Sequence, residues 1–466
     1  MQIRSIRFLS CSFISLILLA LAACGGSSSG TANPPEQPTV TIANASCASS
    51  STNPCPIGVG ANWQLSATVA NAANQNVTWS ISPSGAASGT IGSGTGIYIA
   101  PNAVPSPATV TITATSVADS SATASVPVTI VANDPIGSVA SSSQLGSCEG
   151  SVQNGTCYQL KVSCPLVADF SVYLKVNNPS GVPTGTVLLG TGTGGSGLYD
   201  DPTAGGFDDG SNVVDSLLTS GYNTVQVSFG APFDSGTQPN GWLTGPGGVR
   251  RLACRYATVA DWVYRNPTII NSGVSASNSA PMCATGNSGG SAAIAYAVYE
   301  YGLASEFAMI EPTSGPVMTR IDLGCSPPAS SSFLNACTNL QQDMVYSTGG
   351  SSGGDAAVID EAYQASGATT PTPCTDSING TPPPAGLFLS DSILFEGAQA
   401  VTLPNLPIQQ VFGDTDTSNA VPQGTFWNTY TLPNRAPECL PGVAHDIPSY
   451  AAGATQIAND IAAACH

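Results

Sequence analysis

Two patterns of apolar and polar residues divide the chain. Between residues 38 and 131, short runs such as 77–81 and 110–115 alternate apolar with polar residues, and Gly, Pro, Ser and Asn separate the runs. Alternation with period two predicts half-buried β-strands, and their close spacing predicts a small β-sandwich. From about residue 134 onward, strand-like runs alternate with helix-like runs. This second pattern predicts a mostly parallel sheet flanked by helices.

The second region also predicts individual elements. The expected strands are 157–164, 170–176, 186–189, 224–229, 280–285, 306–311 and 406–412, and the expected helices are 213–221, 249–264 and 291–301. Residues 324–402 are rich in Cys, Pro and Gly and are too long for a plain connection in a compact domain. They predict either an insertion over the functional site or a disordered excursion held by Cys325, Cys337 and Cys374.

The N-terminus bears on location. Arg4 and Arg7 precede an apolar run over residues 8–21, and Leu21-Ala22-Ala23-Cys24 closes it. This segment resembles a bacterial lipoprotein signal, which implies removal of residues 1–23 and acylation of Cys24. An ordinary secretory signal or an uncleaved anchor is the alternative.

The same resemblance implies an exported protein tethered to a bacterial membrane. Gly25 after the cysteine is typical of lipoproteins sent to the outer membrane or cell surface, and residues 24–36 form a Gly/Ser/Pro tether. No later stretch approaches the roughly 20 apolar residues needed to span a bilayer. We therefore expect a protein held at the membrane by its N-terminal lipid.

Cysteine content and charge narrow the function classes. Apart from Cys11 and Cys24, 12 of the 14 cysteines remain, an even number that predicts disulfides in an exported chain. Cys47 with Cys55, and Cys148 with Cys157 or Cys164, are local candidates. With two histidines and no C-x-x-C, no metal site is predicted. The 28 acidic and 10 basic residues disfavour nucleic acid as a partner, and the net charge of −18 has solubility as its simplest explanation.

The candidate nucleophile is chosen by context. G-x-S-x-G occurs at residues 26–30, at 286–290 and, as two overlapping matches, within 349–354. Only the serine of the second match, Ser288, follows a buried strand-like run and precedes an Ala-rich helix-like run, as a strained strand-to-helix turn requires. Ser351 and Ser352 remain alternatives with weaker flanking elements.

The candidate general base follows from scarcity. A serine needs an imidazole to accept its proton, and the chain holds only His445 and His466. His466 is the last residue, at a terminus expected to fray. We expect His445 to be the base.

Two resemblances extend this interpretation. The runs at 77–81, 89–91, 96–101 and 110–116 resemble bacterial Ig-like domains of surface proteins, which implies an Ig-like sandwich over residues 37–132. Such a module either contacts a polymer or cell surface or acts as a spacer. The element order around Ser288 resembles the α/β-hydrolase fold over residues 134–466, with residues 324–402 where that family places lids and caps.

The α/β-hydrolase resemblance implies the remaining site residues. The family's acid follows the nucleophile and precedes the histidine, and its G-x-x-D spacing selects Asp416 after the 406–412 strand, with Asp414 as the alternative acid. The oxyanion donors are then the amide of Gly289 and an amide of Thr191 or Gly192, with a flexible Gly/Thr turn as the alternative explanation of that glycine-rich loop.

The implied activity is carboxylic ester hydrolysis through an acyl-enzyme, without a cofactor, on an ester-bearing small molecule or polymer. An α/β-hydrolase-type peptidase and a non-catalytic surface adhesion protein are the alternatives.

Overall fold

The computed structural model describes residues 36–43, 54–230, 240–271, 281–327, 331–349, 354–365, 368–395, 403–432 and 435–466. The signal-like segment, Cys24, most of the tether, Cys47, Ser351 and Ser352 lie outside the described residues, so the predictions made on them stay predictions. Every helix in the described ranges is too short or too polar to cross a lipid bilayer.

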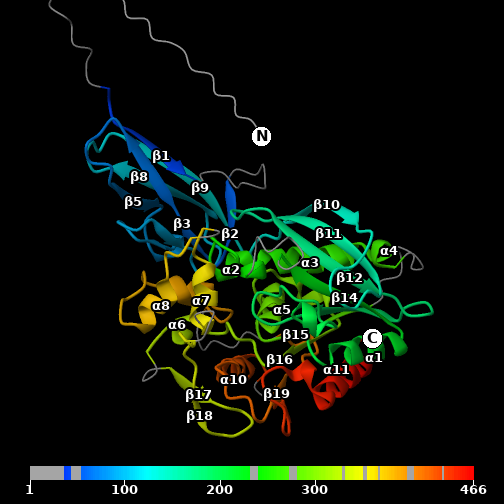
Figure 1. Ribbon diagram of the computed structural model, residues 1–466. Coiled ribbons are helices and arrows are strands. Elements are labelled where there is room, and N and C mark those ends of the chain that lie inside the picture. Colours follow the sequence, from blue (N-terminus) through cyan, green and yellow to red (C-terminus); the bar gives the residue numbers. More distant parts are fainter. Residues whose placement is uncertain are drawn as a thin grey trace, which may run out of the picture. The chain divides into compact units, whose positions relative to one another are not determined.

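The N-terminal β region, residues 38–131, contains three small sheets around one core (Figure 1). Its strands are β1 (Thr39–Ala43), β2 (Cys55–Gly58), β3 (Asn62–Gln64), β4 (Ser66–Ala70), β5 (Val77–Ser82), β6 (Thr90–Ile91), β7 (Ile97–Ile99), β8 (Thr109–Ser116) and β9 (Thr123–Val131). Along β8, alternate residues Val110, Ile112 and Ala114 are fully buried. The period-two pattern therefore gives the predicted half-buried strands, while the Ig-like assignment stays a prediction.

The α/β region, residues 134–466, is built on a nine-stranded sheet with the order β10-β11-β12-β14-β13-β15-β16-β19-β20. Its strands are β10 (Ser138–Gln144), β11 (Thr156–Ser163), β12 (Phe170–Asn177), β13 (Gly185–Gly190), β14 (Tyr222–Phe229), β15 (Met282–Asn287), β16 (Met309–Thr313), β19 (Val411–Gly413) and β20 (Glu438–Leu440). β10, β11 and β12 pair antiparallel, β12 also pairs antiparallel with β14, and the strands from β14 to β20 are parallel.

Helices cover both faces of this sheet because its central strands are apolar on both sides. On β13, Leu188 packs into the core under α3 (Cys254–Arg265) and α5 (Gly289–Tyr299), whereas Val187 and Leu189 face α1 (Gly210–Thr219) and α11 (Ala451–Ala464) (Figure 1). A mixed sheet covered by helices on both faces agrees with the predicted α/β-hydrolase fold. The single helix expected at 249–264 is interrupted by a turn at Ala253, between α2 (Val249–Leu252) and α3.

The insertion, residues 324–402, is folded over its described part. α6 (Ile321–Gly324) leads into it, and it contains β17 (Ser332–Leu334), β18 (Gln341–Asp343), α7 (Gly354–Glu361), α8 (Pro373–Ile378) and α9 (Leu387–Asp391). The remaining helices are α4 (Pro267–Ile270) and α10 (Ala420–Thr431). Disulfides Cys325–Cys374 and Cys337–Cys439 hold the insertion, as expected from its cysteines. The alternative of a disordered excursion is wrong for these ordered segments.

Three further disulfides cross-link the described part of the α/β region. Cys148 pairs with Cys157 rather than with Cys164, which instead bonds Cys254 on α3. Cys283 on β15 bonds Cys465 next to the C-terminus. The last of these bonds joins the end of α11 to the strand that precedes Ser288, at the edge of the sheet opposite to that residue.

Candidate active site

Ser288 lies on a strained turn between a strand and a helix. β15 ends at Asn287, α5 begins at Gly289, and Ser288 between them has φ 54° and ψ −115°. A non-glycine residue with positive φ is strained, and such strain is tolerated where the surroundings enforce it. A Cβ built on Gly286 would lie 2.7 Å from the Gly290 carbonyl carbon, and one on Gly290 would lie 2.6 Å from the Thr191 oxygen. The two glycines therefore permit the close approach that exposes Ser288.

His445 and Asp416 are hydrogen-bonded. The Nδ1 atom of His445 lies 3.0 Å from Oδ2 of Asp416, whose side chain is 1% exposed at the turn after β19. Asp416 also accepts hydrogen bonds from the Ser314 hydroxyl at 3.1 Å and from the Ser418 amide at 2.9 Å. The alternative acid, Asp414, instead accepts from the Gly442 amide at 2.7 Å. Of the two aspartates, the structure brings Asp416 to the imidazole.

The charges of this pair support each other. Burial would raise the pKa of Asp416, but the hydrogen bond and positive charge of His445, with the bonds from Ser418, outweigh it and lower that pKa below its usual range. Burial would lower the pKa of His445, but the hydrogen bond and charge of Asp416, with smaller contributions from Asp446 and Asp355, raise that pKa above 6.5. The pair is arranged to stabilise a protonated imidazole.

Ser288 and His445 line one cavity of about 160 Å³. The other histidine, His466, follows Cys465, whose disulfide to Cys283 holds it near the start of β15. Ser288 follows the other end of that strand, five residues and roughly 16 Å away. Geometry therefore favours His445 over His466 as the partner of Ser288.

The loop after β13 runs beside Ser288. A Cβ built on Gly192 would lie 3.6 Å from the Cβ of Ser288. Among the described residues, the amides of Gly192, Thr193 and Gly289 have no hydrogen-bond acceptor. The Thr191 hydroxyl accepts from the Gly197 amide at 3.2 Å and thus serves the loop itself. Backbone amides beside a nucleophilic serine are the kind of donors that an oxyanion requires.

Thr193 was missed by the sequence reasoning. It lines the cavity with Ser288 and has φ 52°, which turns the loop towards the serine. The signal available in the sequence was its place directly after Gly192 in the glycine run.

Buried contacts fix this loop from the neighbouring strands. Lys175 on β12 forms an ion pair with Asp200 at 2.7 Å, and the two side chains are 0% and 1% exposed. On β14, the Phe229 amide donates to the Gly195 carbonyl at 2.8 Å and the Ser228 hydroxyl donates to the Ser196 carbonyl at 3.0 Å. The loop after β13 is therefore held in place by buried contacts within the protein.

The insertion supplies much of the cavity wall. Asp355, Val358 and Ile359 of α7 line the cavity, together with Val317 and Met318 from the segment after β16. These wall residues were not identified from the sequence, because the composition of the insertion indicated only that a cap was present. Within the described part of the chain, no group of three or more His, Cys, Asp or Glu side chains is arranged to hold a metal ion.

Comparisons with known proteins find only weak similarity, and only to solved structures. No protein-family model matches the chain, and no curated protein does. Among solved structures, a thermostable carboxyl esterase from Bacillus coagulans has a TM-score of 0.35 and 14% identity, with 69% of this chain and 97% of the other covered. A hyperthermophilic esterase from the archaeon Pyrobaculum calidifontis has a TM-score of 0.37 and 17% identity, with coverages of 71% and 83%.

Brefeldin A esterase, described as a bacterial homologue of human hormone sensitive lipase, has a TM-score of 0.38 and 12% identity, with 69% of this chain and 75% of the other covered. Values of this size support no residue-by-residue correspondence, so the site rests on the geometry of this chain.

Proposed function

We propose that the protein is an exported serine hydrolase that cleaves carboxylic esters with Ser288 as nucleophile, His445 as general base and acid, and Asp416 as the carboxylate that orients the imidazole. One observation carries the proposal. Ser288 stands on a strained turn and lines the same cavity as His445, whose Nδ1 is bonded to the buried Asp416. A serine nucleophile is activated by a nearby imidazole that a carboxylate orients, and this arrangement supplies both groups.

The reaction proceeds in two balanced steps. The Ser288 hydroxyl attacks the ester carbonyl carbon and gives its proton to Nε2 of His445. The tetrahedral oxyanion accepts hydrogen bonds from the amide of Gly289 and from that of Gly192 or Thr193. The C–O bond to the alcohol then breaks, the alcohol takes the proton from His445, and the acyl group remains on Ser288. Water, deprotonated by His445, releases the acid and restores the serine.

The cavity suits a short acyl group. Its volume of about 160 Å³ and its apolar wall of Val317, Met318, Val358 and Ile359 favour a small apolar chain. Asp355 at the same cavity adds a negative charge, so we infer that neutral or cationic esters are preferred over anionic ones.

The location is proposed from the N-terminal sequence. Acylation of Cys24 holds the enzyme at the bacterial membrane, where it meets ester-bearing extracellular material. Incorporation of radiolabelled palmitate by the wild-type chain, and its absence in Cys24→Ala, is the expected result.

Covalent labelling tests the assignment of the nucleophile. A fluorophosphonate probe is expected to modify one residue, Ser288, in the full chain, and Ser288→Ala is expected to lose both labelling and ester hydrolysis. Ser351→Ala and Ser352→Ala are matched controls that keep both. If Ser351→Ala or Ser352→Ala instead loses labelling, the replaced serine and not Ser288 is the nucleophile. No labelling of the folded wild type would favour a non-catalytic surface protein.

Matched substrates separate the two hydrolytic reactions. An ester and an amide with the same acyl group are compared at equal concentration, with faster turnover of the ester expected. Cleavage of the amide alone would identify a peptidase.

A further inference from the structure

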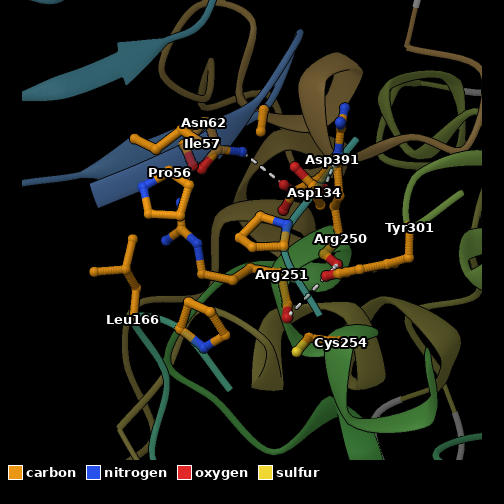
Figure 2. Close-up of a pocket in the computed structure, with 13 residues that line it drawn as sticks. Pro56, Ile57, Asn62, Asp134, Leu166, Arg250, Arg251, Cys254, Tyr301 and Asp391 are labelled. Atoms are coloured by element: carbon orange, nitrogen blue, oxygen red, sulfur yellow. Dashed lines mark hydrogen bonds and ion pairs between the residues drawn. The ribbon is translucent and has the colours of Figure 1, made fainter. Parts of the chain in front are cut away.

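The β region and the α/β region meet at a buried set of charged and amide side chains (Figure 2). Arg250 on α2 is 2% exposed and binds Asp134 at 2.6 Å and Glu300 at 2.7 Å. Its NH2 group also donates to the Val59 carbonyl of the β region at 2.8 Å. The cavity left at this contact is about 30 Å³, room for about one water molecule. The two regions are therefore in close contact here.

Glycines allow this close packing. A Cβ on Gly60 would lie 2.0 Å from the Phe395 ring, and one on Gly386, at the start of α9, would lie 2.6 Å from Ile99. The contact thus joins the β region to the insertion as well as to α2.

Asp391, at the end of α9, is the centre of this contact. Its Oδ1 accepts a hydrogen bond from the Asn62 amide of β3 at 2.6 Å (Figure 2). Its Oδ2 accepts from the Val249 amide at 2.9 Å and from the Tyr363 hydroxyl at 2.7 Å. Asp391 is 2% exposed and Asn62 is 6% exposed, so the loss of either side chain would leave a buried polar group without its partner.

Two short paths lead from Asp391 to the walls of the cavity that holds Ser288. Tyr363 lies two residues beyond α7, whose Val358 and Ile359 form one wall. On the other path, the Ile393 amide donates to the carbonyl of Met318 at 3.1 Å, and Met318 lines another part of the cavity wall. Both walls are thus attached to the segment that Asn62 holds.

We propose that the β region is a built-in part of the substrate site, and that the hydrogen bond from Asn62 to Asp391 positions the two walls that select the acyl group. Asn62 and Asp391 are positioning residues, and neither touches the substrate. The proposal rests on ester hydrolysis at Ser288. It assigns the β region a role other than a spacer or a polymer-binding module.

Reversal of the hydrogen bond tests this proposal in the full chain. Asn62→Asp sets two carboxylates against each other, and Asp391→Asn removes the charge that three donors share. In the double variant, the amide of residue 391 can donate to the carboxylate of residue 62, so the bond is restored with its direction reversed.

Two measurements report on position rather than on folding alone. Each single variant is expected to raise KM for a hexanoyl ester about 10-fold relative to an acetyl ester, with kcat for the acetyl ester changed less than about 3-fold. Hydrogen exchange over α7 is expected to accelerate in the single variants. The double variant is expected to recover the wild-type KM ratio and the protection of α7.

Val110→Ala is the control for general damage to the β region, because Val110 is fully buried on β8 away from this contact. Equal effects of this control and the single variants would overturn the proposal, as would single variants that match the wild type in both measurements. Failure of the double variant to recover either measurement would also overturn it. A wild type that hydrolyses no ester would instead refute the proposed function, while the exchange of α7 would still decide the positioning role.

Discussion

Replacement of Asp416 by Asn tests the chemistry of the His445 pair most directly. In the proposed mechanism, Asp416 accepts the proton of His445 Nδ1 in a hydrogen bond, which leaves Nε2 free to accept the proton of Ser288. An asparagine with its amide nitrogen turned to Nδ1 would donate to that atom and favour the wrong tautomer. It would also remove the charge that stabilises the imidazolium.

The size of the effect depends on a second acceptor. The Ser418 hydroxyl lies 3.1 Å from the same Nδ1 atom, so in Asp416→Asn it can accept the Nδ1 proton and preserve part of the productive tautomer. Loss of a triad carboxylate costs about 10⁴-fold in kcat in the best-studied serine protease. With Ser418 present we expect a smaller loss, about 10³-fold, and a further loss of about 10-fold in the double variant Asp416→Asn with Ser418→Ala.

The pH dependence supplies an independent check. Asp416 is the main group that raises the pKa of His445, so kcat/KM of the wild type should fall on the acid side at a pH above 6.5. In Asp416→Asn this acid limb should move to lower pH. Initial rates on an acetyl ester between pH 4 and pH 9 give both quantities. An acid limb that stays in place, or a loss below about 10-fold, would refute the proposed role of Asp416.

Three further predictions concern other charged groups. Burial and the neighbouring Asp460 raise the pKa of Glu311 well above 4.5. The contribution of Glu311 to the free energy of unfolding is therefore full below pH 4.5 and is lost as pH rises. In urea unfolding, the free energy of unfolding should fall less between pH 5 and pH 8 for Glu311→Gln than for the wild type. Lys175→Met leaves Asp200 buried without a partner, so the free energy of unfolding should fall by about 3–5 kcal/mol, and adding Asp200→Asn should recover part of it; equal stability of the single variant and the wild type would contradict a structural role for the pair. Asp355→Asn should lower kcat/KM for a cationic ester about 2- to 5-fold relative to a neutral ester of the same shape, because an exposed carboxylate attracts a cation only weakly, and an unchanged ratio would exclude this residue from substrate selection.

The residues that the sequence predicted best are those whose role is set by local geometry. The glycines around Ser288 require a tight strand-to-helix turn, and β15 and α5 begin and end within about two residues of the predicted elements. His445 is predicted from composition rather than from local geometry, because the chain has only two histidines that could serve as the base. Asp416 was chosen over Asp414 by spacing, and both lie at the predicted edge of the sheet.

The residues that the sequence reasoning missed depend on contacts between distant segments. Cys164 bonds Cys254 across 90 residues, and no local pattern distinguishes that partner from the nearby Cys148. The cavity wall of α7 has the same origin, because contacts between distant segments, such as those of Asp391 with Tyr363 and with the Val249 amide, place the insertion. The sequence could indicate that a cap exists, but not which of its side chains face Ser288.

This division between local and distant determinants suggests where selectivity resides. The atoms that react belong to the edge of the sheet, where Lys175 and the residues of β14 fix the loop beside Ser288 through buried contacts. In the proposed enzyme, the walls that meet the acyl group come from the insertion and from the segment after β16, and both are linked through the segment around Asp391 to Asn62 in the β region. A substitution at the contact between the regions should therefore alter which ester fits while the rate of the chemical step is kept. The β region would then be a means of changing specificity without touching the catalytic residues.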